Sequence, residues 1–157
     1  MRTPTSEKEL DALLAEPSAQ LVRVMQELPG DITILGANGK IGLSLANLAK
    51  AAAVKAGTDK KIYAVSRFSD IEGKEKLESW GIETIVCDLL DQKQVEKLPV
   101  TENVIFMAGR KFGTIGSEPL TWAMNALVPA NCAVHYKDSR IVVFSTEIGR
   151  ASCRERV

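Results

Sequence analysis

The stretch Ile32–Ser44, ITILGANGKIGLS, decides the fold of this 157-residue chain. Its first four residues form a short apolar run, which is typical of a buried β-strand. Three glycines follow at the spacing GxxGxxG, namely Gly36, Gly39 and Gly42, and residues 40–56 then take up helical periodicity. This order of strand, glycine-rich turn and helix predicts a junction that binds a nucleotide. The alternative is a turn with a purely structural role.

Each glycine of the turn has a physical reason. Gly36 lets the chain turn sharply, Gly39 lets the backbone approach a pyrophosphate, and Gly42 lets the helix pack closely on the strand. The N-terminus of the following helix presents free N–H groups and the positive end of its dipole to the phosphates. A P-loop is excluded because Ile41 stands where that motif needs Ser or Thr. We expect the cofactor to contact Gly36, Asn38, Gly39, Lys40, Ile41 and Gly42.

The same alternation of strand and helix continues along the chain. Further apolar runs at 61–66, 82–88, 103–109 and 140–145 read as strands, and helical patterns at 70–80, 92–98 and 118–136 separate them. Short continuous apolar strands alternating with helices predict an α/β fold, a Rossmann-like doubly wound parallel sheet. We divide the chain into an N-terminal helical arm over 1–30, a dinucleotide-binding domain over 31–146 and a tail over 147–157.

Composition excludes several classes of function. Hydrophobic residues make up 45% and charged residues 25%, and the formal net charge is zero. This balance favours neither nucleic acid nor a membrane as partner. The three cysteines, Cys87, Cys132 and Cys153, lie far apart, which argues against a disulfide framework or a zinc site and fits the cytoplasm.

The end of the second strand bears on the choice of cofactor. An NAD site typically has an acid there to hold the ribose 2′-hydroxyl, whereas this chain has Ser66 and Arg67. A hydroxyl and a guanidinium suit a 2′-phosphate, so we predict NADP, with NAD as the alternative. Lys40 adds charge from the glycine loop. Arg67 and Lys40 could instead be solvated surface charges, and Asp70 could reach a ribose if the loop folds back.

Several motifs together match a known family. These are GANGKIG after the first strand, CDLLD after the third, FMAG after the fourth, WAMN in the next helix and VVFST in the fifth strand. Over residues 31–146 the chain resembles the N-terminal half of an extended short-chain dehydrogenase/reductase, in the NAD(P)-dependent epimerase/dehydratase group. The resemblance implies an oxidoreductase that acts on a sugar-nucleotide-like or other hydroxyl/carbonyl substrate, and a parent protein that forms a homodimer.

The resemblance also implies four further cofactor contacts. Asp88, with Leu89 beside it, would lie near the adenine ring, and Ala108 and Gly109 would let the cofactor lie flat. The alternatives are a helix cap for Asp88, a role that Asp91 could also fill, and an ordinary turn for Ala108 and Gly109.

The following helix carries residues with other interpretations. Asn125 either supports the active site or bonds its amide to the backbone. The only histidine, His135, is interpreted as a structural or surface residue. Trp122, Met124 and Leu127 are expected to pack in the core against the sheet.

No catalytic residue is assigned. The family is expected to use a hydroxyl just past the fifth strand and a Tyr-x-x-x-Lys on the next helix. Ser145 and Thr146 begin such a loop, but no Tyr-x-x-x-Lys follows, and Tyr63 and Tyr136 precede the fifth strand.

The last eleven residues, EIGRASCRERV, resemble the translation of a sequencing-adapter read-through. We therefore expect a fragment that is truncated before a sixth strand, is itself inactive and at most binds the cofactor. The alternatives are a genuine short protein with a basic tail and a non-catalytic NAD(P)-binding sensor or regulatory module.

Overall fold

A parallel sheet with the strand order β3-β2-β1-β4-β5 organises the fold. The computed structural model describes residues 3–110 and 116–144. Within them every neighbouring pair of strands is parallel, and the central strand β1 pairs with β2 on one side and β4 on the other. The strands are β1 (Ile32–Leu35), β2 (Ile62–Ser66), β3 (Glu83–Val86), β4 (Asn103–Phe106) and β5 (Arg140–Val143).

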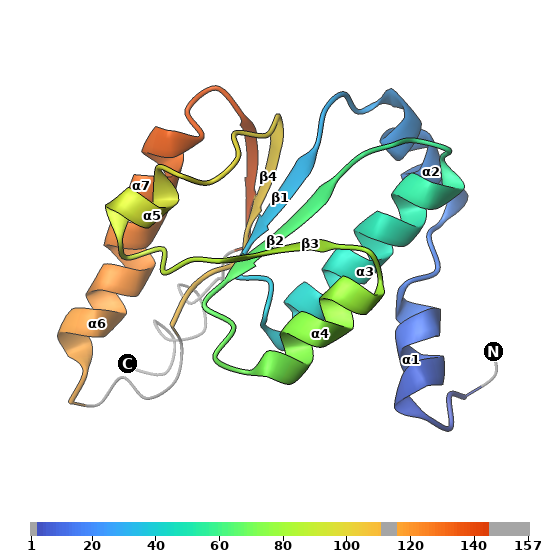
Figure 1. The fold of residues 1–157 in the computed structure, drawn as a ribbon, viewed down its shortest axis with the longest axis horizontal. Helices are drawn as coiled ribbons and strands as arrows, with labels where there is room; N and C mark the ends of the chain where they lie inside the picture. Colours follow the sequence, from blue (N-terminus) through green and yellow to red (C-terminus); the bar gives the residue numbers. More distant parts are fainter. Residues whose placement is uncertain (1–2, 111–115, 145–157) are drawn as a thin grey trace, which may run out of the picture.

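Helices cover both faces of the sheet (Figure 1). One group consists of α1 (Glu7–Leu14), α2 (Ala19–Glu27), α3 (Lys40–Lys55) and α4 (Ile71–Ser79). The other consists of α5 (Gln92–Val95), α6 (Glu118–Trp122), the single π-helical turn η1 (Ala123–Leu127) and α7 (Val128–His135). This arrangement confirms the prediction of an α/β, Rossmann-like sheet. No helix in the described part of the chain is both long and apolar enough to cross a membrane.

The hydrophobic core has two halves, one on each face of the sheet. On the α3 side, the alternate β1 residues Ile32 and Ile34 pack with Ala46, Ala49 and Ala52. These alanines lie on one stripe of the helix and let α3 approach the sheet closely. On the other side, residues from β1, β2 and β4 pack with α7: Leu35, Val65, Val104, Phe106, Val128, Cys132 and Tyr136.

A polar network fixes the amino ends of the central strands. The Asn103 side-chain amide donates to the carbonyls of Pro29 (2.9 Å) and Asp31 (3.0 Å). Arg140 Nε donates to Asn103 Oδ1 at 3.0 Å, so the same asparagine links β4 to β5. The buried Thr101 hydroxyl donates to the Thr33 hydroxyl at 2.9 Å. These bonds join the end of the N-terminal arm to the sheet and satisfy polar groups that would otherwise be costly to bury.

The helix predicted over 118–136 is interrupted by η1. The N–H of Val128 donates to the carbonyl of Ala123, five residues earlier, which is the bond of a π turn. Pro129 follows at once, and proline lacks an N–H and clashes with the carbonyl four residues before it. The prediction that Trp122 and Leu127 pack in the core is wrong, because their exposed fractions are 75% and 51%. Met124 does pack against the α7-side core.

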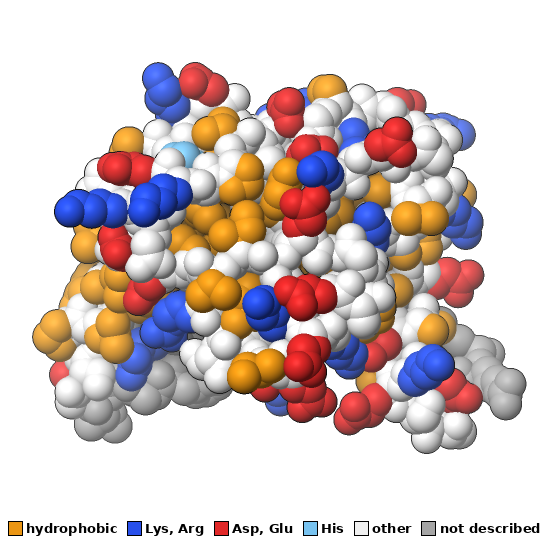
Figure 2. All heavy atoms as spheres, in the orientation of Figure 1, with side chains coloured by type: hydrophobic (Ala, Val, Ile, Leu, Met, Phe, Trp, Pro, Cys, Tyr) orange, Lys and Arg blue, Asp and Glu red, His pale blue; other side chains and the backbone are white. Residues whose placement is uncertain are grey.

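The outer edge of β5 is apolar and exposed. Among the residues that the structure describes, β5 pairs only with β4, and Val142, Val143 and Phe144 are each at least half exposed. Figure 2 shows acidic and basic side chains intermixed over the face in view. That face therefore carries no large patch of one charge that would keep two copies of the chain apart. An apolar edge strand without inward-facing charge is a template for pairing with another chain.

We therefore expect the protein to associate at increasing concentration through β5. Replacing Val142 with lysine should lower the associated fraction severalfold, because an edge lysine opposes strand pairing. The matched control is Val54→Lys on α3, a valine that is 67% exposed but lies on a helix. Sedimentation at several concentrations measures the effect. A wild-type chain that stays monomeric throughout and unfolds cooperatively would contradict this expectation.

Candidate functional site

The candidate site is a cleft at the carboxyl ends of the strands. Its volume is about 310 Å³. It lies where the strand order reverses, because the chain passes from β1 to β2 on one side and the later strand β4 lies on the other. Open α/β sheets bind ligands at this reversal point. The cleft is lined by Gly36, Asn38, Gly39, Ser66, Arg67, Ser69, Cys87, Asp88, Leu89, Met107, Ala108, Gly109 and Met124.

The turn after β1 is held against its neighbours at Gly36. Its φ is +89°, a left-handed conformation, and an added Cβ would lie 2.7 Å from the backbone nitrogen of Ala108. The N–H groups of Gly36 and Ala37 both donate to the carbonyl of Val65, at 2.8 and 3.2 Å. The turn is thereby fixed to the ends of both β2 and β4, and a side chain at Gly36 would force them apart.

Gly42 and Gly39 meet different surroundings. An added Cβ at Gly42 would collide with Ala37, lying 2.7 Å from its carbonyl carbon, so Gly42 serves the packing of α3 on the turn. Gly39 has an ordinary φ of −83°, and its Cβ would find only the carbonyl oxygen of Gly36, at 3.8 Å. The fold therefore does not require glycine at position 39. A bare backbone there, at the N-cap of α3, leaves a cradle open to a bound group.

Three polar side chains form one rim of the cleft after β2. Ser66, Arg67 and Ser69 line it, and Arg67 is exposed. None of the ion pairs within 3–110 and 116–144 includes Arg67. Asp70 does not fold back toward the cleft but caps α4, where its Oδ1 accepts from the N–H of Glu72 at 3.1 Å. The rim therefore offers hydroxyl and guanidinium donors to an anion.

Phe68 interrupts this rim. Its φ is +48°, the one positive φ of a non-glycine residue among those described, and its side chain is buried in the α3-side core. A left-handed conformation at a non-glycine residue costs about 1–2 kcal/mol. Burial of the phenylalanine ring stabilises the fold by about 1.5–3 kcal/mol, which offsets the cost of the left-handed backbone.

The loop after β3 contributes Asp88 and Leu89. Asp88 Oδ1 accepts from the N–H of Leu90 at 3.0 Å, and the Asp88 N–H donates to Gln94 Oε1, also at 3.0 Å. The cap of α5 is Asp91, whose Oδ1 accepts from the N–H of Lys93 at 3.0 Å. Asp88 therefore does not serve as the helix cap, and it is one of the residues that line the cleft.

The loop after β4 is braced by Asn125. Its side-chain oxygen accepts from the Arg110 N–H and its amide donates to the Arg110 carbonyl, both at 2.9 Å. Of the two interpretations of Asn125, the bond to backbone is the one observed. Gly109 leaves room for this amide, because an added Cβ would lie 3.3 Å from the Asn125 oxygen. Asn125 thus holds the segment that carries Ala108 and Gly109 at the cleft.

Nine of the twelve predicted cofactor residues line the cleft together, and three do not. Lys40 and Ile41 are exposed in the first turn of α3, and Gly42 is buried beneath it. The contacts of all twelve residues with a cofactor stay predictions. Ser145, Thr146 and the tail 147–157 lie outside the described residues.

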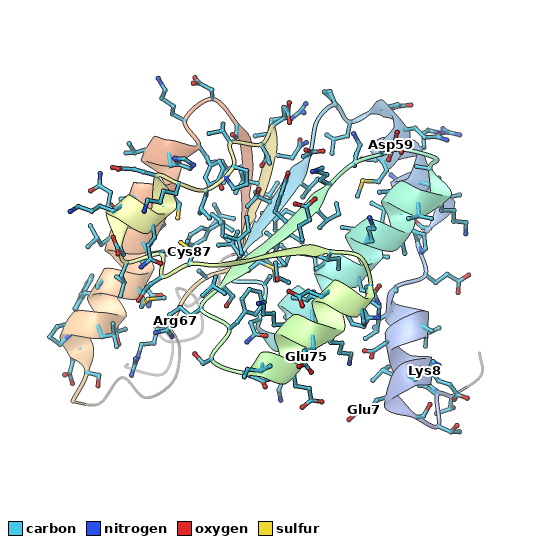
Figure 3. The ribbon with its side chains drawn as sticks, viewed as in Figure 1. Glu7, Lys8, Asp59, Arg67, Glu75 and Cys87 are labelled. Atoms are coloured by element: carbon cyan, nitrogen blue, oxygen red, sulfur yellow. The ribbon has the colours of Figure 1, made fainter. Side chains whose placement is uncertain are left out.

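Sequence reasoning missed Ser69, Cys87, Met107 and Met124. Cys87 follows the last residue of β3, and Met107 follows the last residue of β4. Their position at the carboxyl ends of predicted strands could therefore have identified them as cleft residues. Burial, then the charges of Asp88 and Asp91, raises the pKa of the Cys87 thiol to about 11. The thiol is therefore neutral at physiological pH and adds an apolar wall. Figure 3 shows Cys87 and Arg67 in the same region, between the two groups of helices.

His135, the last residue of α7, and its C-cap Tyr136 both contact the segment after α5. Tyr136 is buried, its hydroxyl donates to the carbonyl of Pro99 at 3.2 Å, and burial raises its pKa to about 12. His135 contacts the carbonyl of Leu98 at 3.1 Å through Nε2 and the Tyr136 ring edge-on. Neither is among the residues that line the cleft. Within the described ranges, no cluster of three or more His, Cys, Asp or Glu side chains could hold a metal ion.

Neither a scan against protein-family models nor a search of curated proteins found a match for this chain.

The tight contact at Gly36 predicts a steric cost beyond that of its backbone conformation. Gly57 is the matched control, because its φ is +67° and an added Cβ would meet nothing within 4 Å. We expect Gly57→Ala to lower the free energy of unfolding by about 1 kcal/mol. Gly36→Ala should lower it by at least about 1 kcal/mol more, since the clash moves backbone. Urea denaturation measures both, and equal losses would show that the contact with Ala108 is not tight.

Proposed function

We propose that the chain binds a dinucleotide in the cleft, NADP in preference to NAD. One observation carries the proposal: the cradle at Gly39, which the fold does not need, opens beside a rim of Ser66 and Arg67. The cleft is at the small end of the range for ligand sites. The position at the reversal of strand order supports a nucleotide over an unrelated small molecule.

The residues of the chain divide the binding among them. Main-chain N–H groups after Ala37, at the end of the glycine turn and the start of α3, hold the diphosphate, because the helix dipole is positive there. Asp88 and Leu89 lie at the adenosine part, and Ala108 and Gly109 present a flat surface without bulk. A bound NADP would supply hydride transfer. The low-polarity wall of Cys87 and Met107 excludes water from one side.

The rim after β2 supports the phosphorylated cofactor. A 2′-phosphate carries two negative charges, and a guanidinium with neighbouring hydroxyls can bond it several times. The carboxylate that would favour a free ribose is occupied elsewhere, since Asp70 caps α4. NAD therefore remains the weaker ligand.

We also propose that the chain belongs with the NAD(P)-dependent epimerase/dehydratase group, on the motifs quoted above. The complete protein would be an oxidoreductase for a sugar-nucleotide-like or other hydroxyl/carbonyl substrate, active as a homodimer in the cytoplasm. This chain is assigned binding only, because Tyr136 is buried in the core and Tyr63 lies within β2. The second candidate, a non-catalytic sensor module, is favoured by the same two observations. The gene sequence beyond Thr146 separates them: a continuing frame with Tyr-x-x-x-Lys supports the enzyme.

A bulky residue at position 39 should abolish binding without unfolding the protein. We expect Gly39→Leu to weaken NADPH and NADH at least a hundredfold, because the side chain fills the diphosphate cradle. The free energy of unfolding should fall by no more than about 1 kcal/mol, the usual range for an N-cap change. Fluorescence titration and urea denaturation test the two parts. Unchanged affinity, or a cooperatively folded wild type that binds neither cofactor, would refute the proposal.

Removing the guanidinium should separate the two cofactors. We expect Arg67→Ala to weaken NADPH about ten- to a hundredfold, the range for one lost charge-assisted bond, and to leave NADH within about threefold. Arg23→Ala is the control, an exposed arginine on α2 that does not line the cleft. Isothermal titration of both variants with both cofactors measures this. Equal losses for NADPH and NADH would show that Arg67 does not contact a 2′-phosphate.

A further inference from the structure

We propose that Phe68 is a positioning residue, whose left-handed backbone conformation sets the selectivity of the cleft for a 2′-phosphorylated cofactor and brings Ser69 into the rim. This inference rests on the proposed function and names a residue that does not itself line the cleft.

The conformation of Phe68 is unusual for its residue type. Asparagine and aspartate adopt positive φ more easily because their short polar side chains bond locally, and glycine has no Cβ to clash. Phenylalanine has neither advantage. Its φ of +48° must therefore be imposed by the surrounding structure.

The burial of the ring supplies that constraint. Phe68 is 7% exposed and belongs to the core cluster that also contains Ala37 of the glycine turn and Leu77 of α4. The ring therefore packs in the same cluster as the glycine turn and α4. Because the ring is fixed there, the backbone of residues 67–69 must take the conformation that lets it reach this cluster.

The segment around Phe68 is also anchored at both ends. Before it, the Val65 carbonyl accepts from the glycine turn, and the Ser66 carbonyl accepts from the Cys87 N–H at 2.9 Å. After it, Asp70 caps α4. Only residues 67–69 connect these fixed points, so the φ of Phe68 sets the course of the chain from Arg67 to Ser69.

This course brings Ser69 back to the cleft. β2 ends at Ser66, and a chain that stayed extended would carry residue 69 away from that end at about 3.3 Å per residue. In this structure Ser66, Arg67 and Ser69 all line the cleft while Phe68 lies in the core. The left-handed turn at Phe68 thereby keeps the Ser69 hydroxyl beside Ser66 and Arg67 at a single rim. That set of donors and that charge suit a phosphate dianion.

A matched pair of substitutions separates ring burial from backbone conformation. Leucine and isoleucine have the same atoms, but only isoleucine is β-branched and strongly disfavours positive φ. We expect Phe68→Leu to keep the wild-type ratio of NADPH to NADH affinity within about twofold. Phe68→Ile should reduce that ratio about tenfold through weaker NADPH binding, with NADH affinity unchanged within about twofold. Ser69→Ala should reduce it in the same direction.

The outcomes are distinct for the two proposals. If both variants keep the wild-type ratio, or both lose it equally, the left-handed conformation does not set selectivity and the inference is overturned. It is overturned as well if Phe68→Ile loses cooperative unfolding and both cofactors together, because the conformation would then serve the fold alone. If the folded wild type binds neither cofactor, the proposed dinucleotide-binding function is wrong. If the wild type binds NADPH and NADH equally, dinucleotide binding stands, but the rim does not select a 2′-phosphate.

Discussion

The site depends on one close approach, where the turn after β1 meets the ends of its two neighbouring strands. The Val65 carbonyl accepts from the N–H groups of Gly36 and Ala37, and Gly36 lies against the backbone of Ala108. These contacts hold the carboxyl ends of β1, β2 and β4 together. Since the loops that follow those strands carry the cleft residues, this approach also sets the distance between the cradle and the rest of the site.

The core explains why the cleft is where it is. Each face of the sheet is sealed by its own helices, and α3 packs closely through small residues such as Ala46 and Ala49. At the carboxyl edge the chain leaves β1 and β2 for the helices of one face, and β3 and β4 for the helices of the other (Figure 1). There the apolar wall of Cys87 and Met107 meets the charged rim of Arg67. Apolar walls with a few convergent polar groups are the usual composition of a ligand site.

The proposed function rests on the residues of the cleft, because a fold alone does not specify chemistry. A cradle of bare backbone, a guanidinium rim and a carboxylate at the opposite loop occur together in one cleft. The acid that could have favoured NAD, Asp70, is engaged at α4. The exposed edge of β5 is a separate property of the same chain, and it bears on association without altering the cleft.

The sequence by itself determined the parallel sheet, the glycine turn and most of the cleft. Period and spacing are local signals, and Gly36, Gly39, Asp88 and their neighbours follow strands that such signals locate. Only the tertiary structure decided that Trp122 is exposed and that Ser69 joins the rim. Both depend on contacts between segments distant in the chain: which side of the 118–135 helical segment meets the sheet, and which core receives the ring of Phe68. No local period encodes those contacts, because packing imposes them against the intrinsic preference of the residue.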